Sequence, residues 1–329
     1  MFMIRKDLRA AAACIWAALV LSAICSPARA QDWPTRAVKF VLPIGAGSGA
    51  DIGARLIAEK LSARWGQPVV VENRPGGDGF VALTGFTSGR DDHTLLYAPA
   101  TTFTGHPYLH DKLPYNPGVL VPIVRVSSTL ISIGAPPSFA ASLKDMFDKA
   151  RAEPGKLNWT TTTGATDLII RAFFKKAGLD LVRVPYRDPI QGQNDVAEGR
   201  VHLYWSAYAI VQAQAQAGRI KVLAITSSEP TAILPGVPTV AQAGSPDLTF
   251  DGLIGLFSTR DTLPAPVRER IGADVRAVLD DPAIVQRLTA TGQTVVPGTA
   301  ADFAAAIDRQ RSALADFAKV LGIKAATIE

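Results

Sequence analysis

Apolar runs of strand length alternate with amphipathic stretches through the first third of this 329-residue chain. The runs that predict short buried strands are 38–42, 69–72 and 94–98. The stretches that predict helices between them are 52–65 and 79–87. Alternation of short apolar strands with amphipathic helices is typical of an α/β protein.

The same alternation returns in the middle of the chain, and the last third is mostly helical. The strands predicted in the middle are 157–161, 181–184, 201–205 and 221–226. The helices predicted there and beyond are 142–152, 167–177, 190–198, 207–217, 265–279, 282–290 and 301–320.

Two long extended segments, 124–134 and 250–258, flank the middle unit. Their positions predict a first domain made of 31–130 and 250–329, with a second domain, 131–249, inserted into it. The two segments would cross between the domains and act as a hinge. Because ligands often bind at domain interfaces, we expect the binding residues in the cleft between these domains.

The first 30 residues have the pattern of a secretory signal peptide. Arg5, Lys6 and Arg9 precede an apolar run over 10–24, and 28–30 offers small residues at the positions that signal peptidase reads. The run is shorter than the ~20 apolar residues of a membrane-spanning helix. We therefore predict export and cleavage before Gln31 rather than a membrane anchor.

Composition narrows the chemistry of the exported chain. Both cysteines, Cys14 and Cys25, lie in the predicted signal, which excludes disulfides, thiol catalysis and cysteine-bound metals from the remainder. Four basic residues and one acid within 1–30 account for +3 of the net charge of +5. The remainder is close to neutral, so its charge gives no reason to expect nucleic-acid binding.

The segment 43–51, Pro-Ile-Gly-Ala-Gly-Ser-Gly-Ala-Asp, connects the first predicted strand to the first predicted helix. Three glycines let the backbone approach a bound group closely, and the N–H groups of the helix start point at it. This suits an anion, either a carboxylate or a phosphate. The glycine spacing does not fit a dinucleotide loop, and no Gly-Lys-Ser/Thr completes a P-loop. Asp51 is expected to cap the helix and stiffen the loop while bordering the ligand.

A second strand-to-helix connection, 161–167 (Thr-Thr-Thr-Gly-Ala-Thr-Asp), adds side-chain hydroxyls to the backbone donors. Thr166 and Asp167 suit either a helix cap or a ligand contact, and the sequence leaves both open. Together, the two loops are expected to face one cleft and hold one anion.

No catalytic constellation is evident. Of the four histidines, only His106 and His110 stand four residues apart, and Pro107 is expected to disturb a helix between them. No carboxylate pattern completes a zinc site, and no Gly-x-Ser-x-Gly motif supplies a hydrolase nucleophile. We predict a binding protein with no catalytic residue, metal or cofactor.

Several short motifs occur in register after residue 30. They are WPTR (33–36), the 43–51 loop, VENRPG (71–76), KLPYNP (112–117), PGKLN (154–158), VPYR (184–187), AGRI (217–220), LAIT (223–226) and LPGVPT (234–239). With these motifs the chain resembles the substrate-binding proteins of bacterial tripartite tricarboxylate transporters, the Bug family. The resemblance implies a periplasmic, two-domain α/β binding fold of the type II-like, Venus-flytrap kind, in which one loop from each domain grips a carboxylate.

Family positions carry over to both loops, to the turn over 73–80, which is implied to border the pocket, and to two residues of the second domain that are implied to face it. The ligand-binding residues implied in this way are Ile44, Gly47, Ser48, Gly49, Asp51, Phe80, Thr161, Thr162, Thr163, Gly164, Asp195 and Trp205. Four positions depart from the family pattern: Ile44 replaces phenylalanine, Ala50 replaces a hydroxyl residue, Phe80 replaces asparagine or threonine, and Trp205 is unusually large. These departures predict a carboxylate ligand with an apolar or aromatic body rather than citrate.

The resemblance implies a monomer that delivers its ligand to membrane transporter subunits. A periplasmic sensor feeding a two-component system is the alternative, and an enzyme on the same fold is a weaker one. The fold class also includes effector domains of transcription regulators, but the predicted signal peptide argues against that function.

Overall fold

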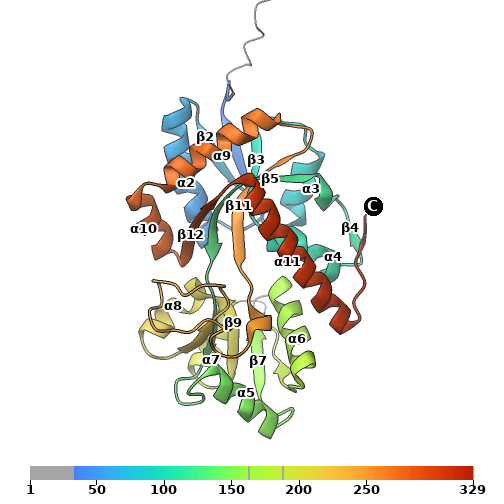
Figure 1. Cartoon of the computed structure of the whole chain (residues 1–329), viewed down its shortest axis with the longest axis vertical. Helices are drawn as coiled ribbons and strands as arrows, with labels where there is room; N and C mark the ends of the chain where they lie inside the picture. Colours follow the sequence, from blue (N-terminus) through green and yellow to red (C-terminus); the bar gives the residue numbers. More distant parts are fainter. Residues whose placement is uncertain (1–32, 162–163, 187–188, 329) are drawn as a thin grey trace, which may run out of the picture. The chain divides into compact units, whose positions relative to one another are not determined.

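The computed structural model describes residues 33–161, 164–186 and 189–328 (Figure 1). Ala37–Glu329 forms one compact unit. The predicted signal peptide and its cleavage site lie outside the described residues, as do Thr162 and Thr163. None of the described helices has the length and apolar content needed to span a bilayer.

The first sheet has six strands in the order β12-β5-β11-β3-β1-β2. Their bounds are Val38–Leu42 (β1), Val69–Asn73 (β2), Thr94–Pro99 (β3), Leu120–Thr129 (β5), Gly252–Thr259 (β11) and Gln293–Gly298 (β12). β1 pairs in parallel with β2 and β3, whereas β11 is antiparallel to β3 and β5. The carboxyl ends of β1, β2 and β3 therefore meet at one edge of the sheet, where α/β proteins bind ligands.

The second sheet has five strands in the order β10-β6-β9-β7-β8. Their bounds are Ile131–Ala135 (β6), Asn158–Thr161 (β7), Val182–Arg183 (β8), Leu203–Ala207 (β9) and Lys221–Ile225 (β10). β7 is parallel to β8 and β9, and β6 is antiparallel to β9 and β10. A separate two-stranded ribbon pairs β4 (Lys112–Leu113) with β13 (Thr327–Ile328).

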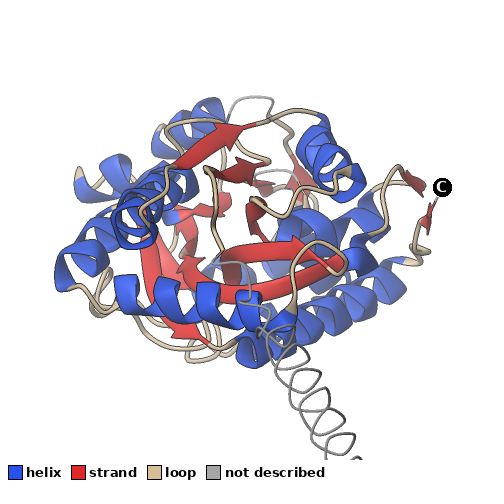
Figure 2. Ribbon diagram, turned by 90° about the horizontal axis from the view of Figure 1, so that it is seen from above, coloured by secondary structure: helices blue, strands red, loops and turns tan. Residues whose placement is uncertain are grey.

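Helices surround the strands (Figure 2). Their bounds are Gly49–Trp65 (α2), Phe80–Ser88 (α3), Thr101–Leu109 (α4), Leu143–Ala152 (α5), Ala165–Ala177 (α6), Pro189–Ala197 (α7), Tyr208–Gln216 (α8), Ala265–Leu279 (α9), Pro282–Ala290 (α10) and Ala300–Leu321 (α11). Three short 3₁₀ turns are Gly77–Gly79, Pro117–Val119 and Pro246–Leu248. Several helices begin at a side chain that accepts an N–H of the first turn, as Ser142 does for α5 and Thr299 for α11.

The chain passes between the two sheets twice. It crosses from β5 to β6 at Leu130, and it returns between β10 and β11. The C-terminal helix α11 belongs to neither sheet alone, because it packs on β5 and also on α6. Its residues Leu314 and Ala318 are buried in the apolar cluster of the second sheet.

The structure confirms the predicted α/β class and most of the predicted elements, with α9 and α10 at their predicted bounds. The extended segment 124–134 is two strands rather than one, because the chain changes sheets at Leu130. The sequence reading missed α4 and β12. Pro107 does not interrupt a helix between His106 and His110 as expected, because α4 continues through this proline to Leu109.

Gly255 in the middle of β11 provides a test of the packing between β11 and α11. A Cβ at this position would overlap the carbonyl oxygen of Val124 and the ring of Phe303. We expect Gly255→Ala to lower the free energy of unfolding by about 1–3 kcal/mol, measured by urea unfolding. Gly45→Ala is the control, since a Cβ there meets no atom within 4 Å. Equal stability of the two variants would contradict this packing.

Candidate functional site

A cavity of about 310 Å³ lies where the carboxyl ends of β1, β2 and β3 face the start of α6. Its walls come from four segments: Pro43, Ile44 and Gly45; Pro75, Gly76, Asp78 and Gly79; Thr101, Thr102, His106 and Leu109; and Gly164, Ala165 and Thr166. Three segments follow strands of the first sheet, and the fourth follows β7 of the second. Helix starts and hydroxyl groups at such strand ends form a donor-rich surface suited to an anion.

The glycine-rich loop after β1 is held by a buried carboxylate. Ser48 caps α2 by accepting the N–H of Asp51 at 3.2 Å. The Asp51 carboxylate in turn accepts the N–H of Gly47 at 2.8 Å and bonds with Arg55. Ser48, and not Asp51, is therefore the helix cap, while Asp51 stiffens the loop as predicted.

Asn73 joins this loop to the end of β2. Its amide nitrogen donates to the Asp51 carboxylate at 2.9 Å and to the carbonyl oxygen of Ile44 at 3.1 Å, and its oxygen accepts from Arg55. Burial raises the pKa of Asp51, but the hydrogen bonds from Gly47, Arg55 and Asn73 outweigh burial and hold that pKa below its usual value. Asp51 is thus an ionised scaffold group, 2% exposed and satisfied by the protein.

The turn after β2 adopts left-handed backbone at four consecutive residues. Gly76, Gly77, Asp78 and Gly79 all have positive φ, and Asp78, at 55°, is the one non-glycine residue with this conformation among those described. A Cβ at Gly79 would lie 2.7 Å from the side chain of Thr102. Glycine at 79 therefore lets the turn pack against the start of α4.

The three segments from the first sheet form the first wall of the cavity, and 164–166 forms the second wall. Contact between α4 and α6 brings the second wall close to the first. Gly105 of α4 faces Ala165 at the start of α6 so closely that an added Cβ would lie 3.1 Å from the Ala165 Cβ. Asp167 is occupied by ion pairs with Arg171 and Arg183. Neither Thr166 nor Asp167 caps α6, because its N-cap is Gly164, with no side-chain cap hydrogen bond. Asp167 is paired within the protein, and Thr166 lines the cavity.

The predicted binding residues fall into four groups. Ile44 and Gly164 line the cavity. Gly47, Ser48, Gly49 and Asp51 build the loop behind its wall. Thr162 and Thr163 lie outside the described residues.

Four further predicted residues are engaged elsewhere. Trp205 is 1% exposed in the core of the second sheet, and Thr161 donates to its carbonyl oxygen. Asp195 accepts from the Tyr186 hydroxyl and pairs with Arg200; these partners lower the pKa of Asp195. Phe80 is half-buried against two histidine rings. None of the four is among the described residues that line this cavity.

The turn over 73–80, which the family resemblance implied as a border of the pocket, does line the cavity and includes Asp78, whereas Thr101, Thr102 and His106 were missed. A signal for the threonines was present, because 97–102 repeats the pattern of an apolar strand followed by hydroxyl residues. For His106 there was none, since 28 residues separate it from Asp78 and only the fold brings the two together.

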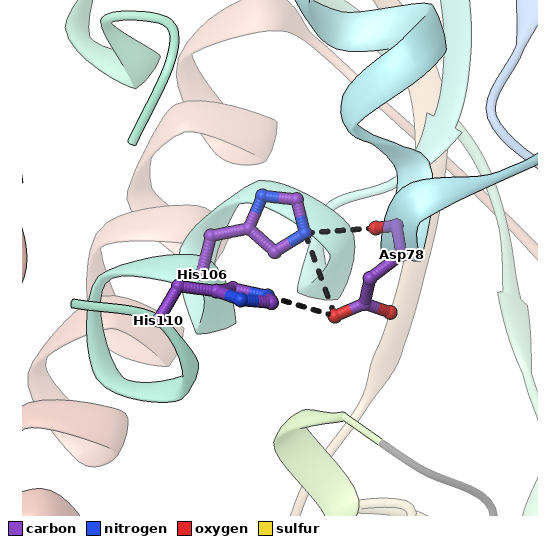
Figure 3. A group of neighbouring side chains, drawn as sticks. All are labelled: Asp78, His106 and His110. Atoms are coloured by element: carbon purple, nitrogen blue, oxygen red, sulfur yellow. Dashed lines mark hydrogen bonds and ion pairs between the residues drawn. The ribbon is translucent and has the colours of Figure 1, made fainter. Parts of the chain in front are cut away.

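Asp78, His106 and His110 form a group of potential metal ligands (Figure 3). The His110 Nε2 lies 3.2 Å from Asp78 Oδ2, and the His106 Nε2 lies 3.8 Å from the same oxygen and 2.9 Å from the Asp78 carbonyl oxygen. A carboxylate therefore lies beside both histidines, a proximity that the sequence spacing did not indicate. Burial lowers the pKa of His106, which favours its neutral form.

Comparison with known proteins places this site in context. The family model described as tripartite tricarboxylate transporter family receptor matches residues 53–321. A UPF0065 protein of Bordetella bronchiseptica is 30% identical over 298 residues, covering 89% of this chain and 88% of that protein.

Two solved structures of R. palustris proteins are each 26% identical to this chain. Rpa4515 with adipate has a TM-score of 0.76 and covers 89% of this chain and 99% of its own. MatC with bound malate has a TM-score of 0.72 and covers 87% and 100%, respectively.

Replacing Asp51 tests whether its charge holds the glycine-rich loop. We expect Asp51→Asn to lower the free energy of unfolding at pH 7 by about 1.5–3 kcal/mol, because charge-assisted hydrogen bonds are lost. Because the pKa of Asp51 is lower in the folded protein than in the unfolded chain, its ionised carboxylate stabilises the fold fully at pH values above the unfolded pKa of about 3.9. This stabilisation is lost as the pH falls through the folded-state pKa. The difference from wild type should therefore narrow towards pH 3.

Urea unfolding at pH 7 and at pH 3 measures both effects. Asp308→Asn is the control, because it removes a carboxylate that is 71% exposed on α11. An Asp51→Asn variant as stable as wild type at pH 7 would show that the loop does not depend on this carboxylate.

Proposed function

Because this chain belongs to the family of tripartite tricarboxylate transporter receptors, we propose that it captures a small carboxylate in the cavity between its two sheets. The family consists of solute-binding proteins, which are not enzymes. The observation that carries the proposal is the cavity wall itself, where three strand ends of one sheet face a helix start of the other. The adipate and malate bound to two relatives are both small carboxylates.

The wall supports a ligand with polar ends and an apolar body. Thr101, Thr102 and Thr166 offer hydroxyls, while Ile44 and Leu109 offer apolar surface. Of the four positions that depart from the family pattern, Ile44 lines the cavity and supports a ligand with an apolar body. Trp205 and Ala50 are buried, so their effect on the ligand would be indirect. A linear dicarboxylate or an aromatic acid fits this wall better than citrate, which carries charge along its whole length.

Export to the periplasm and delivery to transporter subunits complete the proposed function. The family model supports the transporter, and the pattern of residues 1–30 supports export. The chain would act as a monomer and bind no nucleic acid. Genes for a large and a small membrane subunit beside this one would favour transport over the alternative of a two-component sensor.

The proposed mechanism is closure of two domains, 31–130 with 250–329 and 131–249, around the ligand. The crossings at Leu130 and between β10 and β11 would bend as the hinge. A ligand that contacts both walls favours the closed state by its difference in affinity for the two states. Closure excludes water, and each charge-assisted hydrogen bond then contributes about 1.5–3 kcal/mol.

Gly45 allows a test of the cavity that leaves the fold intact. It lines the cavity, its φ is ordinary, and a Cβ there meets no atom within 4 Å. We expect Gly45→Val to weaken carboxylate binding by roughly 10- to 100-fold, because the side chain takes space that the ligand needs. The melting temperature without ligand should not change.

Calorimetry with adipate, malate, benzoate and citrate measures this effect, with Ala46→Val as the matched control in the same exposed loop. Binding of citrate but of none of the other three acids would contradict the apolar-bodied ligand. Binding that is unaffected by Gly45→Val would place the carboxylate elsewhere.

Closure predicts a more compact particle on ligand binding. Small-angle X-ray scattering should give a smaller radius of gyration with saturating carboxylate than without it, since the domains approach. The Gly45→Val variant, at the same carboxylate concentration, is the control. An unchanged radius under conditions where calorimetry reports saturation would contradict the hinged mechanism.

A further inference from the structure

The charge of the cavity conflicts with a bare anionic ligand. Among the described residues that line the cavity, Asp78 is the one with a formal charge at neutral pH, and that charge is negative. A carboxylate beside it would be repelled. Some cationic group should therefore compensate Asp78 when the cavity is filled.

The neighbours of Asp78 are suited to hold such a group. Both histidines direct Nε2 at oxygens of Asp78. The carboxylate Oδ2 lies 3.2 Å from His110 Nε2 and 3.8 Å from His106 Nε2, and the carbonyl oxygen of Asp78 lies 2.9 Å from His106 Nε2. In a tetrahedral site, metal bonds of ~2.0–2.2 Å place neighbouring ligand atoms roughly 3.3–3.6 Å apart. The cluster thus needs little rearrangement to enclose an ion.

The buried histidine can change its tautomer to become a ligand. In the metal-free protein its Nε2–H donates to the Asp78 carbonyl oxygen, and the Tyr115 hydroxyl lies 2.8 Å from its Nδ1. When Nε2 binds an ion, the single proton of the neutral ring moves from Nε2 to Nδ1, and Nδ1–H then donates to the Tyr115 oxygen. Metal-bound histidines usually make such an outer hydrogen bond.

The surrounding residues fix the orientation of the three side chains. The Phe80 ring packs against both imidazoles, with centroids 4.4 Å from His106 and 4.6 Å from His110. Asp78 has a φ of 55°, a conformation that costs a residue other than glycine energy. Such local strain is common at binding sites, and here it directs a carboxylate at two histidines (Figure 3).

We propose that Asp78, His106 and His110 bind a divalent transition-metal ion, with Zn²⁺ as the representative case, at the wall of the cavity. Two imidazole nitrogens and carboxyl oxygen suit Zn²⁺, Ni²⁺ or Fe²⁺ better than Mg²⁺ or Ca²⁺. Asp78 and His106 line the cavity, so the open coordination positions face it. The ion would reverse the charge of this wall and accept a ligand carboxylate oxygen, a consequence that rests on the proposed function.

Metal binding is tested first, with no carboxylate present. The full chain is expressed without a histidine tag, recovered from the periplasm, freed of metal with a chelator and titrated with ZnCl₂ in a calorimeter. We expect one equivalent to bind. Asp78→Asn and His110→Gln should each weaken binding at least tenfold, a loss comparable to that caused by removing an outer-shell partner.

Both variants should keep the fold without metal. Asparagine tolerates left-handed backbone, and His110 lies at the end of α4 with 30% of its side chain exposed. Asp92→Asn is the matched control, because Asp91, Asp92 and His93 form the other such group among the described residues. Absence of binding by wild type would overturn the proposal. So would binding that Asp92→Asn abolishes and Asp78→Asn leaves unchanged.

A second titration separates this inference from the proposed function. Adipate is titrated into metal-free and Zn²⁺-loaded wild type. Tighter binding to the loaded protein supports the metal as part of the ligand site, and equal binding overturns that consequence while the metal site stands. Zn²⁺ binding with no carboxylate bound in either form would leave the metal site standing and refute the proposed function.

Discussion

One buried carboxylate determines the shape of the first wall of the cavity. Asp51 holds Gly47 through its N–H, and through Asn73 it is joined to the carbonyl of Ile44 and the end of β2. Glycines alone would leave this loop free to adopt many conformations, at an entropic cost on binding. Because the hydrogen bonds of the Asp51 carboxylate order the loop during folding, the loop loses little conformational entropy when a ligand binds.

The position of the second wall depends on a contact between two helices. Gly105 lets α4 approach the start of α6, and this brings Thr166 opposite the loops of the first sheet. The same helix carries His106 and His110 to Asp78. α4 therefore sets the width of the cavity and also places histidines beside Asp78, its charged lining residue among those described, although nothing in the 101–109 stretch indicates this from sequence alone.

Local patterns predicted the fold well, and the site only where its residues are close in sequence. The loop 43–51 and its stiffening by Asp51 follow from glycine spacing and helix-start chemistry, which act over a few residues. Trp205 was misplaced because a family position does not reveal which face of a strand is buried, and here the indole fills the core. The Asp78 cluster was missed because residues of a turn and a helix meet only through packing.

The C-terminal helix constrains how the proposed closure can occur. α11 packs on β5 of the first sheet, yet Leu314 and Ala318 lie in the apolar cluster of the second. A hinge that bent only at the two crossings would pull these side chains from that cluster, and exposing a buried leucine costs about 1.5–3 kcal/mol. Rotation about an axis near α11 would avoid this cost, because the helix would stay packed on α6 while the loops of the first sheet moved towards Thr166. The proposed closure about this axis would bring Ile44 towards Gly164, the two predicted residues that line the cavity from its two walls.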